Sequence, residues 1–220
     1  MTENTRTVGV DVGGPGKGFH AVCLDQGRII EITHTRDPGD LLVWICSMGA
    51  AVVAIDAPCG WSAGGKSRLA ERELQRAGIH SFYTPARADA LASDFYRWVF
   101  NGESLYRLLA AEYPLFDGQS PGAKTCFETF PHAVTWQFAP GYAIREKRQV
   151  RKAMLERQGC AVDRLTNIDL VDAAVCAMSA EVFSRGERFV TTYPARNAPG
   201  WQREEGLIVV PDLKQQITIE

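Results

Sequence analysis

The alternation of apolar and polar residues predicts three strands at the start of the chain. Residues 7–12, 19–24 and 28–33 are short segments rich in β-branched and apolar side chains. The second and third are joined by a polar turn, Asp25-Gln26-Gly27, whose glycine tolerates a positive φ. Three successive strands with short links are typical of an antiparallel meander.

The next segments predict a helix, a buried strand and a long helical region. Residues 40–48 have apolar side chains at helical spacing, with Asp37 or Asp40 placed to cap the helix. Residues 51–55 (AVVAI) are continuously apolar, as in a strand buried on both faces. Residues 66–113 are mostly helical in pattern, with an interruption at 81–85.

The rest of the chain predicts a fifth strand at 125–129, a basic helix at 144–158 and a helix from Asn167 to Phe183. Residues 207–210 suggest a late edge strand. This order predicts an α/β fold in one domain, residues 1–220. The sheet is expected to be mixed and five-stranded, an antiparallel meander plus parallel strands, with helices on both faces and a helical insertion at about 64–120. The element order resembles that of the ribonuclease H-like fold.

Charge limits the classes of partner. The formal net charge is −2 and the isoelectric point is about 6.1. A chain of this kind does not coat nucleic acid by bulk electrostatics, so binding to a polyanion requires a local basic patch or bound metal ions.

Cysteine usage and hydropathy indicate a cytoplasmic protein. None of the six cysteines forms a C-x-x-C pair, so we expect reduced thiols and no zinc or redox motif. No apolar run approaches the ~18 residues that a membrane span needs. The first ten residues lack the pattern of a signal peptide. We therefore expect a cytoplasmic location and no membrane partner.

Acidic residues stand at the ends of two predicted strands. Asp11 closes the first apolar run and is followed by Gly13 and Gly14, which leave room for a metal, a phosphate or another backbone. Asp56 ends the fourth strand. Neighbouring parallel strands of an open sheet carry their sites at such ends, so Asp11 and Asp56 are expected to be adjacent.

Further acids are expected to converge on the same point. Asp169 and Asp172 are three residues apart on the last helix and share one face, and Glu128 lies in the fifth strand. Like charges ~4 Å apart repel by about 4 kcal/mol at an effective dielectric of 20, so the group needs cations. Oxygen ligation selects Mg²⁺ or Mn²⁺. Two such ions can stabilise the attacking water and the leaving oxygen of a phosphodiester.

Six motifs together resemble the family called domain of unknown function 429. They are GVDVGG, IDAPCGW, RELQRAGIHSFYTPAR, FETFPHA, KRQVRKAML and DLVDAAVCAMSA. The resemblance extends over about residues 8–211, with the motifs in the family's order. It implies a ribonuclease H-like fold and a predicted nuclease activity.

The acid pattern is also similar to that of Holliday-junction resolvases, with one acid on the first strand, one on the fourth and two on the last helix. By that resemblance Asp11, Asp56, Asp169 and Asp172 are the metal ligands. Asp56 stands where the resolvases carry the longer Glu.

Several basic residues are candidates for contact with substrate. Lys147 and Arg151 are four apart on the basic helix and are predicted to bind phosphate, although a charged helix face is often only solvated. Arg87 follows Thr84-Pro85 and either contacts substrate or holds its loop. His132 suits acid–base chemistry, but a structural histidine in a turn is the favoured interpretation.

The sequence supports three hypotheses for function. The first is a metal-dependent nuclease or phosphodiester hydrolase in which Asp11, Asp56, Glu128, Asp169 and Asp172 act with Mg²⁺ or Mn²⁺ on a nucleic acid. The second is a nucleotide-binding relative of the actin-like ATPases, since Asp11 with Gly13-Gly14 resembles their phosphate loop. The third is a non-catalytic binding scaffold. Oligomeric state is left open.

Overall fold

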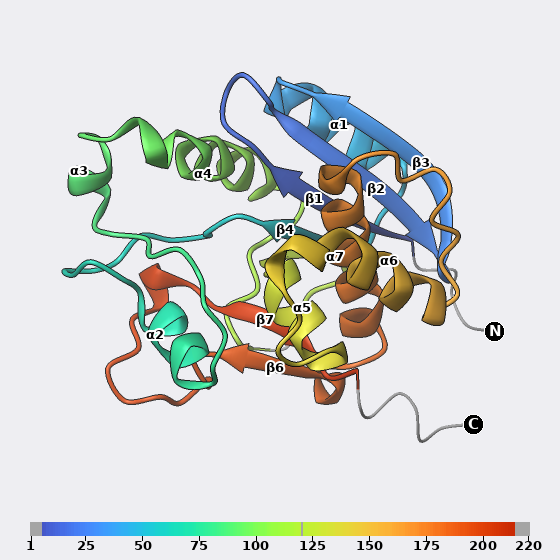
Figure 1. The fold of residues 1–220 in the computed structure, drawn as a ribbon. Coiled ribbons are helices and arrows are strands. Elements are labelled where there is room, and N and C mark those ends of the chain that lie inside the picture. Colours follow the sequence, from blue (N-terminus) through green and yellow to red (C-terminus); the bar gives the residue numbers. More distant parts are fainter. Residues whose placement is uncertain (1–5, 120, 214–220) are drawn as a thin grey trace.

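The computed structural model describes residues 6–119 and 121–213, within which seven strands form one mixed sheet (Figure 1). The strands are β1 (Thr7–Val12), β2 (Phe19–Asp25), β3 (Arg28–Thr35), β4 (Val52–Asp56), β5 (Thr125–Glu128), β6 (Val190–Tyr193) and β7 (Ile208–Pro211). The α-helices are α1 (Pro38–Ser47), α2 (Leu69–Arg76), α3 (Arg87–Ala90), α4 (Arg97–Leu109), α5 (Pro131–Phe138), α6 (Lys147–Arg157) and α7 (Ile168–Ser184). Short 3₁₀ turns lie at Asp94–Tyr96, Ile144–Glu146, Glu187–Phe189 and Arg203–Glu205.

The strand order is β3-β2-β1-β4-β5-β7-β6. The α/β class and the meander are confirmed, since β1, β2 and β3 pair antiparallel while β4, β5 and β7 continue the sheet in parallel from β1. The prediction of five strands is wrong. β7 lies inside the sheet rather than at its edge, and the edge position belongs to β6. β6 has only four residues, VTTY, and its partly exposed side chains give too short a pattern to predict a strand.

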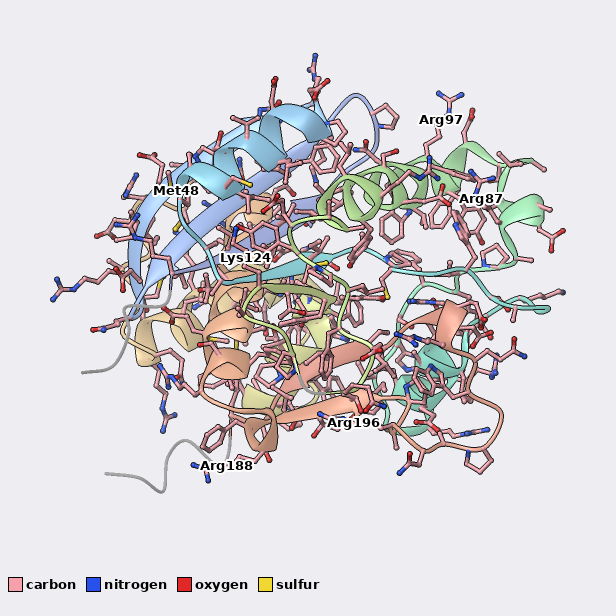
Figure 2. The ribbon with its side chains drawn as sticks, turned by 180° about the vertical axis from the view of Figure 1, so that it is seen from behind. Met48, Arg87, Arg97, Lys124, Arg188 and Arg196 are labelled. Carbon is pink, nitrogen blue, oxygen red and sulfur yellow. The ribbon has the colours of Figure 1, made fainter. Side chains whose placement is uncertain are left out.

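Helices cover both faces of the sheet, as expected. α5, α6 and α7 pack on one face, around a core that includes Val171, Val175 and Met178 of α7. α1 and α4 pack on the other, where Leu41 and Ile45 meet Leu105 (Figures 1 and 2).

β1 shows how alternation along a strand divides these two cores. Val8, Val10 and Val12 belong to the core under α1 and α4, while the intervening positions face α7. Among the latter, the Thr7 hydroxyl donates to the Ala177 carbonyl. A Cβ added at Gly9 would lie 2.0 Å from the Ala173 carbonyl oxygen and from the Ala177 amide nitrogen. Gly9 therefore allows α7 to lie directly on β1.

Two helical segments differ from the sequence prediction. Between β4 and β5 the helical pattern resolves into α2, α3 and α4, with extended chain between α2 and α3. His132 lies in α5 rather than in a turn. That helix begins at Pro131, whose fixed φ suits a first helical position and whose missing N–H is not needed there. In the described segments, no helix combines the length and the apolar character required to cross a membrane.

Candidate metal centre

The centre begins as a row of side chains on three adjacent strands. Asp11 of β1 pairs in register with Asp56 of parallel β4 and with His20 of antiparallel β2. Residues paired across neighbouring strands project to the same face, so all three face α7. The sequence prediction that Asp11 and Asp56 are neighbours agrees with this register.

α7 supplies two further carboxylates. The Asn167 side chain accepts a hydrogen bond of 2.8 Å from the Leu170 amide and caps the helix. The first turn then presents Asp169 and, one turn on, Asp172.

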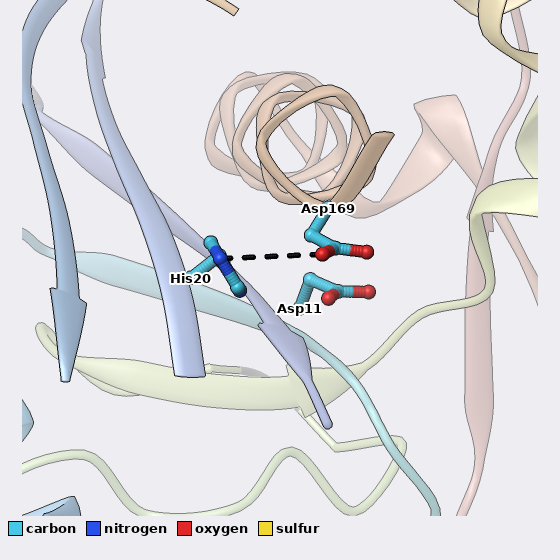
Figure 3. Close-up of side chains that lie close together, drawn as sticks. All are labelled: Asp11, His20 and Asp169. Carbon is cyan, nitrogen blue, oxygen red and sulfur yellow. Dashed lines mark ion pairs between the residues drawn. The ribbon is translucent and has the colours of Figure 1, made fainter. Parts of the chain in front are cut away.

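The strands and α7 together form two groups of potential ligands. One is Asp11–His20–Asp169, shown in Figure 3, and the other is Asp11–Asp56–Asp172. Within each group the ligand atoms lie within 4.8 Å of one another. The structure thus brings together the four aspartates that the sequence proposed as metal ligands, divided between two groups that share Asp11.

Burial and crowding oppose ionisation of these acids. Burial, then the nearby charge of Asp172, raises the pKa of Asp11 to about 7. Burial, then the charge of Asp11, raises the pKa of Asp56 well above its ordinary value. Burial also raises the pKa of Asp172, although Arg151 opposes that shift. A bound cation would reverse these effects by favouring the charged carboxylates.

The chain supplies some compensating charge itself. Lys17, in the loop between β1 and β2, donates a hydrogen bond of 2.6 Å to Asp169 Oδ1 and lies 4.0 Å from Asp11 Oδ2. Arg151 of α6 is buried, forms an ion pair with Asp172 and donates to the Thr135 hydroxyl. Burial lowers the pKa of Lys17, but the hydrogen bond to Asp169 and the nearby carboxylate charges outweigh it and raise the pKa overall.

The residues present fit a divalent ion. Asp11 is 8% exposed, and its Oδ2 atom is buried without a hydrogen-bond partner among the described residues. A buried carboxylate oxygen in that state is costly unless a cation completes it. Oxygen donors from Asp11, Asp56 and Asp172 suit Mg²⁺ or Mn²⁺, and Asp169 and His20 extend the donor set.

Glu128 does not join either ligand group in the described part of the chain. Its partner in the sheet is Ile55, which faces α1 and α4, so the Glu128 side chain leaves β5 on the face opposite Asp11. There it accepts hydrogen bonds from Arg68 at 2.6 and 2.7 Å and from the Cys59 amide at 2.8 Å. Glu128 is therefore a buried, compensated carboxylate in the wall beside the centre.

The predicted phosphate-binding residues fall in three different settings. Lys147 and Arg151 line a cavity of about 410 Å³ that opens at Asp56 and Asp172. Arg151 is already bound to Asp172, whereas Lys147 is partly exposed there. Arg87 pairs with Glu103 and lies near the outer end of α4 (Figure 2), and it is not among the described residues that line the cavity.

The same cavity has aromatic walls. Phe82, Trp98 and Phe130 line it, and Phe82 is largely exposed. Phe82 also meets Phe95 edge to face, with ring centroids 5.4 Å apart. Flat aromatic side chains thus line the same cavity as the carboxylates Asp56 and Asp172.

Two residues of the site, Lys17 and His20, were missed from the sequence, and so was the pairing of Arg68 with Glu128. Lys17 lies in the glycine-rich run GGPGKG, which begins two residues after Asp11 and was a usable indication of a basic group near that carboxylate. His20 could be found only from the register of the β1–β2 hairpin. Arg68 pairs with Glu71 and Glu128, the latter 60 positions away, and no spacing rule indicates such a contact.

Comparison with known proteins gives a family and no function. A family model described as "Protein of unknown function (DUF429)" matches residues 9–197, which include all four aspartates of the centre. No curated protein matches the chain.

Proposed function

The chain belongs to the DUF429 family, and we propose that it is a metal-dependent phosphodiester hydrolase, a nuclease, whose centre is the Asp11–Asp56–Asp172 group with Asp169. The observation that carries the proposal is the buried Oδ2 atom of Asp11, which has no hydrogen-bond partner among the described residues and lies among carboxylates with raised pKa values. The fold we propose is ribonuclease H-like. Its support is the order β3-β2-β1-β4-β5, which contains the antiparallel meander and parallel strands that the sequence resemblance implies.

Each residue has a distinct task in this proposal. Asp11, Asp56 and Asp172 hold the ion, and Arg151 fixes the orientation of Asp172 through their buried ion pair. Lys147, on the cavity wall, contacts a phosphate oxygen of the substrate. A bound Mg²⁺ or Mn²⁺ supplies Lewis-acid polarisation of the phosphoryl group and lowers the pKa of an attacking water.

The cavity favours a substrate that carries a base beside its phosphodiester. Phe82 and Trp98 provide flat faces on which a nucleobase can stack, and stacking of this kind is independent of base sequence. The mildly acidic isoelectric point agrees with local recognition of a short stretch rather than broad electrostatic binding.

The loop between β1 and β2 disfavours the actin-like alternative. A phosphate-binding loop presents free backbone amides to the nucleotide. Here the amides of Lys17 and Gly18 donate to the Gly14 carbonyl, and the Gly13 amide donates to the Gly18 carbonyl. These three donors are used within the loop, which leaves fewer amides for a phosphate, so hydrolysis at the carboxylates remains our proposal.

The test is metal binding and cleavage by wild-type protein and the Asp11→Asn variant. Calorimetric titration of Mn²⁺ and Mg²⁺ into metal-free protein should show saturable binding that Asp11→Asn loses. Loss of a partner behind a metal ligand already costs 10–100-fold, so cleavage of labelled single-stranded DNA or RNA should fall at least about 100-fold. Thermal stability should be unchanged or higher, because the variant removes charge repulsion.

Asp163→Asn is the matched control, since Asp163 is an exposed aspartate outside the centre. It should retain both binding and cleavage. Wild-type turnover by Asp11→Asn would show that Asp11 is not a ligand. Binding of nucleic acid without metal or cleavage would favour the scaffold hypothesis instead.

A further inference from the structure

A lysine ammonium contacts one of the two ligand groups. Lys17 Nζ lies 2.6 Å from Asp169 Oδ1 and 4.0 Å from Asp11 Oδ2, and these two aspartates form the Asp11–His20–Asp169 group with His20. His20 Nε2 lies 4.0 Å from Asp169 Oδ2 (Figure 3). The chain's own positive charge therefore lies against the carboxylates that a second ion would need.

The loop holds Lys17 in this place from both sides. The Lys17 carbonyl accepts a hydrogen bond of 2.7 Å from the His34 ring, and its amide donates to the Gly14 carbonyl. On the other side, the Asn101 side chain donates to the Gly13 carbonyl at 2.8 Å. Because these hydrogen bonds fix the backbone, the Lys17 side chain starts from a defined position within reach of the carboxylates.

The two ligand groups differ in what completes them. In Asp11–His20–Asp169, the Lys17 ammonium neutralises part of the carboxylate charge. In Asp11–Asp56–Asp172, Arg151 binds Asp172, but the described residues form no ion pair with Asp56. An ion is thus needed most in the second group, while the first already holds a cation.

We propose that the Lys17 ammonium takes the place of one of the two ions of a two-metal centre. The chain then binds one divalent ion, at Asp11–Asp56–Asp172, and uses Lys17 as the second positive charge facing the phosphate. Asp11–His20–Asp169 is a latent site, available to a second ion only when the ammonium is removed. This inference rests on the proposed function and specifies its cation requirement.

The test counts bound Mn²⁺ per chain by equilibrium dialysis. Wild type should bind one ion. Lys17→Met keeps the length of the side chain without its charge and should bind two. Lys17→Arg keeps the charge and should bind one. Lys66→Met, at an exposed lysine outside the centre, is the matched control and should also bind one.

A second readout identifies the ligand of the added ion. Pulsed electron paramagnetic resonance of the Mn²⁺-loaded Lys17→Met protein should show coupling to a directly bound imidazole nitrogen. Wild type should lack that coupling, and so should the double variant Lys17→Met/His20→Gln. The double variant should also return to one bound ion. These measurements need no catalytic activity, and circular dichroism checks that each variant is folded.

Failure of this inference is distinguishable from failure of the proposed function. Two ions in wild type, or one ion in a folded Lys17→Met protein, overturns the role of Lys17 and leaves a metal-dependent centre intact. No saturable Mn²⁺ binding by wild type overturns the proposed function itself, and the inference with it.

Discussion

At the scale of single residues, the buried carboxylates around the cavity differ in which groups neutralise their charge. Glu128 is compensated within the chain by Arg68, and Asp172 by Arg151. Asp11 has one buried oxygen without a hydrogen-bond partner among the described residues, and the Lys17 ammonium lies 4.0 Å from it. Structural and functional carboxylates can be separated on this basis, because a purely structural acid has no reason to retain a buried oxygen without a hydrogen bond.

His132, which lies outside the metal centre, makes the free energy of unfolding depend on pH. Burial, then the charge of Arg151, lowers the pKa of His132 from 6.5 to about 4. As the pH falls from 6.5 towards 4, the unfolded chain takes up a proton that folded His132 rejects, so the free energy of unfolding decreases. We expect the free energy of unfolding to be lower by roughly 2–3 kcal/mol at pH 4 because of this residue, and we expect no such decrease well above pH 6.5. Urea unfolding across that range measures it.

The His132→Gln variant should flatten this dependence, whatever it does to absolute stability. His80→Gln, at an exposed histidine, should leave most of the slope in place. Equal slopes in wild type and His132→Gln would show that the buried ring is not responsible.

At the scale of elements, the contact between β1 and α7 determines whether the centre forms. Gly9 is the position at which the helix backbone meets the strand. Gly9→Ala forces its Cβ against two backbone atoms of α7, which cannot move as a flexible side chain can. Overpacking in a core typically costs 1–3 kcal/mol, and we expect a loss of about 3 kcal/mol in the free energy of unfolding.

Gly9→Ala should also weaken Mn²⁺ binding, because α7 carries Asp169 and Asp172. Gly64→Ala is the control, since an added Cβ there meets nothing within 4 Å. Chemical denaturation and metal titration of both variants give the comparison. A Gly9→Ala protein as stable as wild type would mean that α7 does not lie directly on β1.

Elements with a strong local pattern were predictable from the sequence, and those fixed by distant contacts were not. β1 to β4 and α7 have long or strongly apolar patterns, whereas β6 is four partly exposed residues and becomes a strand only by pairing with β7. The same distinction holds in the centre. Asp11 and Asp56 follow from strand adjacency, but the side of the sheet that Glu128 faces depends on a register that the sequence does not reveal.

At the scale of the whole molecule, Arg68 connects segments far apart in the chain. Its guanidinium binds Glu71 in α2, Glu128 in β5 and the Glu205 carbonyl, and its side chain is 1% exposed. Arg68→Met would leave two buried carboxylates without their counter-charge. We expect a loss of about 3–5 kcal/mol in the free energy of unfolding, measured by urea denaturation.

Two variants sharpen the Arg68 prediction. Arg68→Met/Glu128→Gln should be less destabilised than Arg68→Met, because one orphaned charge is removed. Arg107→Met breaks an exposed ion pair with Glu103 and should change stability by less than about 1 kcal/mol. Similar losses at Arg68 and Arg107 would contradict the structural role of the buried network.

The centre has a frame that could be rebuilt in another protein. Asp56, Asp11 and His20 form a row across β4, β1 and β2, and one helix crosses that row over Gly9. A designer who wished to build it on another scaffold would need two parallel strands in register, one antiparallel neighbour and a glycine beneath a helix whose first turns bear two aspartates three residues apart. The loop that carries Lys17 and the helix that carries Arg151 would have to be kept, and the other loops and strands could then be chosen to suit a new substrate.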